Sequence, residues 1–340
     1  TLPIVAWTLA GTAIIAGLLA WRVDINIFNL STFYRNRLNR CYLGAARFVE
    51  GERHPHNFTA LDEDDDFCMA DLMHEKVDKS ATFDPFKGGH AGPFHIVNCA
   101  LNLGGSSDLS LHTRHSASFI ITPYATGSGY IALDSTGNRT QIGYRPTRKY
   151  GGISRYPTLG QAIAISGAAA NPNMGYHTSA QISFLLTMFN ARLGWWFPNP
   201  KDPGKWPSPR FSLRYLLKEL MGTADEKSPF LNVSDGGHFE NLGAYELIRR
   251  QCKVIIVSDA ECDSKLQCEG LARLIRMCRV DFDTEIKIDV SSIRRAQGAA
   301  WSRDWCAVGE ITYEKSRNEK PNGILIYIKA SMTGHEDTSI

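Results

Sequence analysis

The residues best placed to do chemistry are an aspartate and two glycines, Asp235, Gly236 and Gly237. They follow a short, mostly apolar run at 230–233, which is typical of a strand. Glycine permits positive φ angles and close approach of backbone, and open α/β folds bind ligands at the carboxyl ends of strands. An aspartate in such a turn can act as a general base, whereas most Asp-Gly-Gly triplets are plain turns. Asp235 is therefore the leading candidate site residue.

The elements around this turn are expected to be a strand, the turn, a helix and a second strand. Apolar residues between 242 and 248 recur at the spacing of one helix face. The next run, 253–257, is apolar and β-branched almost throughout, which predicts a strand covered on both faces. This order of elements favours an α/β fold with Asp235 at the tip of a strand.

The block Ser-Asp-Gly-Gly at 234–237, with Glu-Asn-Leu-Gly at 240–243 behind it, resembles the Asp-Gly-Gly/Ala block of the patatin-like phospholipases and the related block of cytosolic phospholipases. Residues 158–175 resemble a family segment upstream of that aspartate. Residues 22–47 resemble the segment after the last membrane span of large bacterial membrane proteins that carry a patatin-like domain. Together these similarities cover most of residues 1–300.

The resemblance implies a patatin-like three-layer α/β fold with a central, mostly parallel sheet, and a lipid acyl hydrolase that needs no cofactor. The family works with a Ser-Asp dyad, in which Asp235 would be the base and Gly236 and Gly237 would shape the active-site turn. Its substrate would be a lipid or another acyl ester.

The family's serine lies in a G-x-S-x-G motif upstream of the aspartate, and no such motif occurs in this sequence. We therefore expect a fragment of a longer chain, with the nucleophile upstream of Thr1. Ser166, in Ala-Ile-Ser-Gly-Ala at 164–168, is an alternative nucleophile, and His238 is a further triad candidate although the family dyad has no histidine. The alternative function is a catalytically inactive, membrane-anchored scaffold with the same fold.

A Ser-Asp dyad makes two further demands on the site. An ordinary aspartate, with a pKa near ~3.9, is a weak base, so the dyad needs a partly desolvated carboxylate and a strong oxyanion hole. The pair Gly104-Gly105 resembles an oxyanion turn but lacks the third glycine and the arginine of the family block. We interpret it as a turn.

The first 21 residues carry no charge, and residues 3–21 are long enough to cross a hydrocarbon core. Trp7 and Trp21 fit the two interfaces, and the basic start of a signal peptide is absent. A buried core helix is the alternative. Because the basic residues that follow outnumber the acidic ones, the positive-inside rule places the rest of the chain on the cytoplasmic side.

Three ranges are expected along the chain: a transmembrane helix at 1–21, a basic juxtamembrane helix and an acidic loop at 22–92, and the C-terminal part of the hydrolase domain at 93–340. The basic helix, at 29–48, could lie on lipid headgroups or pack on the domain. The acidic run at 62–66 lacks the glycine and ligand spacing of a calcium loop, so we interpret it as a solvated loop and assign no metal.

Helices are also expected at 159–170, 179–192, 211–221 and 270–279, and strands at 94–103, 118–122, 285–290 and 323–329. The first of these helices is rich in small residues, which suits close packing under a site. The second is expected to bury Ile182, Leu185, Leu186 and Phe189. The aromatic run at 195–197 could form an acyl-chain wall or membrane contact, although a core plug is more common.

Composition and cysteine spacing indicate the class of partner and the cellular compartment. The 340 residues carry a net charge of +2 and no long basic run, which gives no reason to expect nucleic acid as a partner. The eight cysteines form no C-x-x-C pair and no zinc spacing, so we expect reduced thiols in a cytosolic setting.

Overall fold

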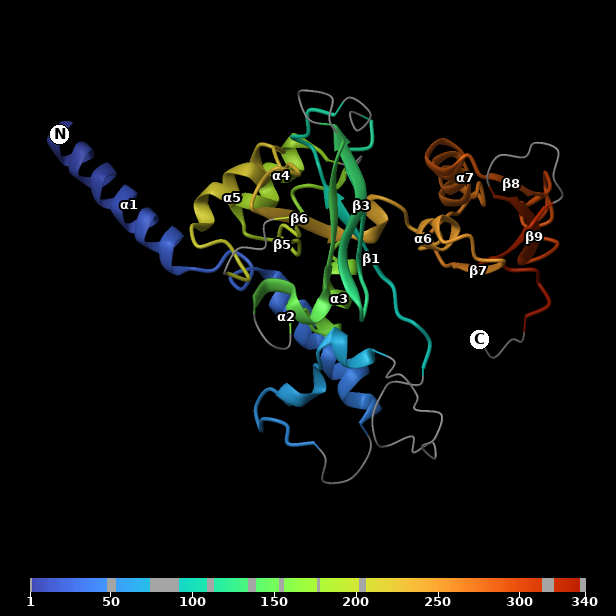
Figure 1. Cartoon of the computed structure of the whole chain (residues 1–340), viewed down its shortest axis with the longest axis horizontal. Helices are drawn as coiled ribbons and strands as arrows, with labels where there is room; N and C mark the ends of the chain where they lie inside the picture. Colours follow the sequence, from blue (N-terminus) through green and yellow to red (C-terminus); the bar gives the residue numbers. More distant parts are fainter. Residues whose placement is uncertain are drawn as a thin grey trace. The chain divides into compact units, whose positions relative to one another are not determined.

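The computed structural model describes residues 2–47, 53–73, 92–108, 113–133, 139–152, 156–175, 178–201, 206–313 and 321–336. They belong to two compact units, unit 1 from Thr1 to Phe239 and unit 2 from Glu240 to Ile340. Figure 1 shows the elements of both. The boundary falls directly after the Asp-Gly-Gly turn, and the sequence does not predict a division at this position.

Unit 1 contains a six-stranded sheet in the order β4-β3-β2-β1-β6-β5, and every neighbouring pair in it is antiparallel. The expected central, mostly parallel sheet is therefore wrong for this unit. Parallel neighbours need long crossovers, whereas β2 ends at Ile121 and β3 already begins at Ala125. The strands are β1 (Val97–Asn102), β2 (Ser116–Ile121), β3 (Ala125–Leu133), β4 (Arg139–Pro146), β5 (Trp195–Pro198) and β6 (Phe230–Asp235).

The core of unit 1 gathers on β1, β2, β5 and β6. Trp196 and Phe197 of β5 are fully buried, and Phe197 packs against Phe119 of β2 and Tyr150. The Tyr150 hydroxyl donates to the carbonyl of Pro198 at 2.6 Å. The aromatic run at 195–197 is therefore a core plug.

The helices of unit 1 match the expected positions, and all except α1 are shorter than expected. They are α1 (Leu2–Arg22), α2 (Leu30–Leu38), α3 (Leu159–Ser166), α4 (Ala180–Met188) and α5 (Ser212–Leu220). After α2 the chain continues as a π-helix, Asn39–Leu43, and short 3-10 turns lie at Gly44–Ala46, Glu63–Asp65, Met69–Leu72, Thr147–Gly152 and Gly236–His238.

Helix α3 packs closely on the end of the basic helix, as its small residues predict. A Cβ at Gly160 would lie 1.8 Å from Oδ1 of Asn39, so the side chain of Asn39 occupies the space that the glycine leaves. Thr158 caps the helix by accepting from the backbone N–H of Gln161 at 3.2 Å. The basic helix thus packs on the domain through this contact.

The acidic run at 62–66 is not a solvated loop throughout. Asp65 is buried and forms ion pairs with Arg47 at 2.9 Å and Arg53 at 2.7 Å. Asp66 accepts hydrogen bonds from the Thr158 hydroxyl at 2.8 Å and the Gly160 N–H at 2.9 Å. The run therefore ties the basic helix and the start of α3 together, which a count of charges does not reveal.

Unit 2 contains a four-stranded sheet in the order β7-β10-β9-β8, in which only β7 and β10 are parallel. Its elements are α6 (Tyr245–Arg249), β7 (Val254–Asp259), α7 (Glu269–Phe282), β8 (Glu285–Ile288), β9 (Cys306–Thr312) and β10 (Gly323–Lys329). Leu271 and Leu274 of α7 cluster with Ile255 and Val257 of β7. The alternate residues of β7 are exposed, so the expectation of a strand covered on both faces is wrong for this unit.

Candidate active site

Asp235 is the last residue of β6, and a 3-10 turn at Gly236–His238 follows it. Oδ1 of Asp235 accepts a hydrogen bond from the backbone N–H of Gly237 at 2.7 Å. A Cβ at Gly236 would lie 2.7 Å from the carbonyl oxygen of Asn98 in β1, so this position requires glycine. The two glycines thus hold the carboxylate at the strand tip, as the sequence suggests.

The environment of Asp235 makes its carboxylate more basic than usual. The side chain is half-buried, and desolvation raises its pKa above the ordinary range, opposed by the hydrogen bond from Gly237. In the described part of the chain, Asp235 forms no ion pair. An aspartate without a cationic partner and with a raised pKa accepts a proton more readily than an exposed one.

Cys99, which pairs with Asp235 across β1 and β6, does not supply a nucleophile. Burial, and to a lesser extent the charge of Asp235, raises the pKa of the Cys99 thiol. Since the thiolate is the reactive form, a fully buried thiol of this kind is inert.

His238 and Ser234 form a buried pair beneath the turn. The Ser234 hydroxyl lies 2.8 Å from Nδ1 of His238 and accepts a hydrogen bond from Nδ2 of Asn102 at 2.8 Å. The Ser234 hydroxyl thus links Asn102 to the ring of His238, and the tautomer of the histidine sets which of the two donates in their bond. This arrangement holds His238 against the sheet and gives it a positioning role.

A chain of buried polar side chains continues from this pair, and sequence reasoning missed it. Asn102 donates to Oδ1 of Asn232 at 2.8 Å, and Asn232 donates to Oε1 of Glu219 at 3.2 Å. Glu219 is paired with Arg192 at 3.1 Å and accepts from the Trp196 indole at 2.6 Å. The signal was present: asparagines inside apolar strands need buried partners.

Ser166, the alternative nucleophile, lies at the end of α3 and donates to the carbonyl of Asn98 at 2.7 Å. The same carbonyl faces Gly236. The structure thus brings Ser166 and the Asp-Gly-Gly turn to one peptide of β1, but the Ser166 proton goes to a carbonyl. A nucleophilic serine needs a base within hydrogen-bond reach.

The glycine pair at 104–105 is a turn, as we interpreted it. The N–H of Gly105 donates to the carbonyl of Ala224 at 2.8 Å, and a Cβ on Gly105 would lie 2.7 Å from Thr223. Its backbone N–H is therefore already used and does not form an oxyanion hole.

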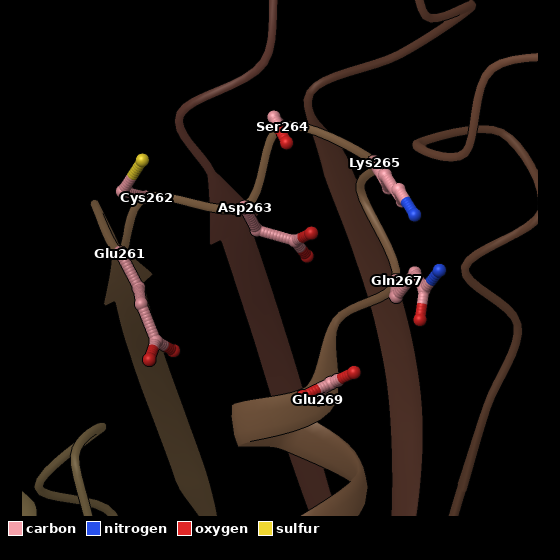
Figure 2. Close-up of a pocket in the computed structure, with 7 residues that line it drawn as sticks. All are labelled: Glu261, Cys262, Asp263, Ser264, Lys265, Gln267 and Glu269. Atoms are coloured by element: carbon pink, nitrogen blue, oxygen red, sulfur yellow. The ribbon is translucent and has the colours of Figure 1, made fainter.

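A pocket lies in unit 2, in the loop after β7 (Figure 2). Its charged lining consists of Glu261, Asp263, Glu269 and Lys265. In the described residues no group of three or more His, Cys, Asp or Glu side chains could hold a metal. This pocket has acidic character but no arrangement that identifies a reaction.

No protein-family model and no curated protein matches the chain. Among solved structures, human GIVD cytosolic phospholipase A2 is similar with a TM-score of 0.37 and 14% sequence identity, over 70% of this chain and 35% of that one. The chain therefore spans about a third of that protein's length, and similarity at this level does not show a shared fold.

Proposed function

We propose that this chain belongs to a membrane-attached lipid acyl hydrolase of the phospholipase or esterase type, with Asp235 as the general base of a Ser-Asp dyad. The observation that carries the proposal is the carboxylate itself. It is half-buried at a strand tip, held by one backbone N–H, without an ion pair in the described residues, and its pKa is raised by desolvation. The resemblance of residues 234–237 to the patatin-like block supports the substrate class.

The reaction proceeds in two steps. Asp235 takes the proton of a serine hydroxyl while the serine oxygen attacks the carbonyl carbon of the ester. Asp235 then gives this proton to the leaving alcohol, and the acyl group remains on the serine. Water then attacks the acyl carbon while Asp235 accepts its proton; the bond from that carbon to the serine oxygen breaks, Asp235 returns the proton to this oxygen, and the fatty acid is released from the free serine. The serine is proposed to come from a G-x-S-x-G segment outside these 340 residues, and Gly236 and Gly237 keep the base in place.

Attachment to the membrane is proposed from α1. This 21-residue helix is apolar and long enough to cross a bilayer, and Ala20 is the one buried residue among its described side chains. Arg22 ends it, and the basic segment that follows favours a cytoplasmic position for the rest of the chain. A hydrolase anchored in this way meets its lipid substrate at the membrane surface.

A specific observation favours a second candidate, the inactive scaffold. In the described part of the chain no serine hydroxyl is hydrogen-bonded to Asp235, and the Ser166 hydroxyl is bonded to Asn98. A chain that lacks the nucleophile would retain the fold and the anchor without the reaction.

The test is fatty-acid release from a fluorogenic ester by the full-length protein in detergent micelles. Asp235→Asn keeps the shape and the hydrogen bond from Gly237 but removes the base, and should lower kcat/KM by roughly 10²–10⁴-fold. Asp225→Asn is the matched control, because Asp225 also bonds backbone N–H groups in a turn and pairs with Lys218. Unchanged activity in Asp235→Asn removes Asp235 as the base, and an inactive wild-type protein establishes the scaffold.

A further inference from the structure

Helix α4 exposes most of its apolar side chains. Ser183 is its only buried residue, and Leu186 is partly buried, whereas Ile182, Leu185 and Phe189 are exposed, so the predicted burial of these three is wrong. The exposed fractions are 45% for Ile182, 52% for Phe184, 52% for Leu185, 66% for Met188 and, directly after the helix, 70% for Phe189.

The orientation of α4 is fixed by a polar contact. The Ser183 hydroxyl donates to the carbonyl of Pro172 at 2.5 Å, which turns the polar side of the helix inward. A helix on a water-exposed surface normally shows the opposite arrangement, and contiguous exposed apolar side chains mark a binding surface. The apolar side of α4 therefore has the character of a binding surface.

The surface continues into the loop that follows α1. Ile27 and Phe28, five and six residues after Arg22, are 63% and 67% exposed. Nδ2 of Asn190, just past α4, donates to the carbonyl of Phe28 at 2.7 Å, so the end of α4 contacts this loop. We call Ile27, Phe28, Phe184, Leu185, Met188 and Phe189 the α4 surface.

Buried hydrogen bonds hold this loop against the sheet. Asn26 bonds both backbone groups of Trp196, its amide nitrogen donating at 2.9 Å and its oxygen accepting at 2.8 Å. Arg192, buried and paired with Glu219, donates to the carbonyl of Ile25 at 2.5 Å. The loop after α1 is therefore a fixed connection to β5, and the α4 surface is held beside the point where α1 ends.

Cationic side chains flank the same region. The Ser212 hydroxyl donates to the carbonyl of Val23, which brings the start of α5 to the end of α1. Arg210, two residues earlier, stacks over the half-exposed ring of Trp206 at 4.3 Å. Arginine and tryptophan beside an apolar surface are the composition of a membrane interface, where basic groups meet anionic headgroups.

We propose that the α4 surface inserts into the headgroup and upper acyl region of the bilayer that α1 spans. The proposal rests on the membrane attachment given under the proposed function, and it is independent of the role of Asp235. Its occupant is the lipid surface, because the apolar residues adjoin the end of the membrane-spanning helix, where Arg22 ends α1 and the segment that carries Arg210 is also bound. The bound domain would then have a defined pose on the membrane.

The test uses the full-length protein in lipid nanodiscs, with an environment-sensitive fluorophore on single cysteines. Phe184→Cys and Phe189→Cys report on the surface, and Phe58→Cys, at a position 92% exposed and outside the surface, is the control. All three are made with Cys41→Ser, Cys252→Ser, Cys262→Ser and Cys306→Ser, because these four cysteines are exposed or partly exposed and would also react with the label. The lipid carries a nitroxide quencher high on its acyl chain.

The fluorophores at 184 and 189 should lose about half or more of their emission in quencher-bearing lipid, because interfacial helices sit roughly 5–10 Å into the headgroup and acyl boundary. The fluorophore at 58 should lose little. The same quenching is expected in Asp235→Asn, so this result and the activity result are read separately. Equal emission with and without quencher, or crosslinking between labelled positions of two copies, overturns the proposal, as does failure of the chain to enter nanodiscs.

Discussion

The same three residues, Val-Ser-Asp, end strand β6 at 233–235 and strand β7 at 257–259, yet the two aspartates have opposite surroundings. Asp235 is half-buried, is held by one backbone N–H and has a pKa raised by desolvation. Asp259 is buried and ion-paired with Lys329 at 3.0 Å, and it accepts the Tyr327 hydroxyl. The tripeptide is identical, so the environment alone separates a candidate base from a structural anion.

The contrast extends to the groups around each carboxylate. Burial and the neighbouring Asp259 raise the pKa of Tyr327, so its hydroxyl remains a donor to that carboxylate. Lys329 also donates to the carbonyl of Glu261 at 3.0 Å. The charge of Asp259 is thus balanced inside unit 2, whereas that of Asp235 has no cationic partner among the described residues.

The largest effect is expected from breaking the balanced pair. Asp259→Asn leaves the buried Lys329 without its partner and should lower the free energy of unfolding of unit 2 by about 3–5 kcal/mol. Asp235→Asn, the same exchange at the other strand end, should leave stability equal or higher, because it removes a desolvated charge. Denaturant unfolding of both variants measures this difference. A similar loss in both would mean that Asp235 is a structural anion too.

The double variant Asp259→Asn with Lys329→Met sharpens the same comparison. Removing both charges eliminates the unpaired ammonium, so the double variant should recover much of the stability that Asp259→Asn loses. The double-mutant cycle formed with the two single variants gives the coupling free energy between Asp259 and Lys329. Additive losses would show that the two charges do not depend on each other.

A smaller effect is expected from the polar chain beneath Asp235. Asn232→Leu leaves Asn102 and Glu219 each short of one hydrogen bond, and should lower the free energy of unfolding by about 1–3 kcal/mol. Thermal unfolding checks this value. A more stable variant would show that the chain of polar groups is not needed to hold β6.

The smallest effect is expected at Ser166. Ser166→Ala removes one hydrogen bond to Asn98 and should lower stability by about 0.5–1.5 kcal/mol, with ester hydrolysis changed less than tenfold. The assay is the same fatty-acid release in micelles. Loss of activity by orders of magnitude would instead make Ser166 the partner of Asp235.

Local features of this chain could be predicted from the sequence. The turn at 236–238 follows directly from a strand run and two glycines, and the close packing of α3 follows from its small residues. The direction of strand pairing could not be predicted, because alternation within 94–103 or 118–122 says nothing about which strand lies alongside. The antiparallel sheet of unit 1 depends on contacts distant in sequence.

The predicted burial of most of the apolar residues of α4 and the predicted exposure of the acidic run at 62–66 are wrong for one physical reason. Periodicity in α4 shows that apolar residues are present, but not whether their side faces protein, water or lipid, and only the inward Ser183 decides it. In the same way, the charge of Asp65 predicts an exposed side chain, whereas its ion pairs with Arg47 and Arg53 allow it to be buried. Partners far along the chain set both outcomes.

The most direct test of Asp235 as the base is the pH dependence of kcat/KM for ester hydrolysis. Burial raises the pKa of Asp235 in the folded chain. The contribution of this group to the free energy of unfolding is therefore greatest below the pKa that it has in the unfolded chain, and it is lost as the pH rises through the folded pKa. Activity has the opposite dependence, since only the ionised form accepts a proton. We predict an acidic limb that rises through a single ionisation above the ordinary aspartate range and is absent from the residual activity of Asp235→Asn. The same limb in both proteins would contradict the assignment.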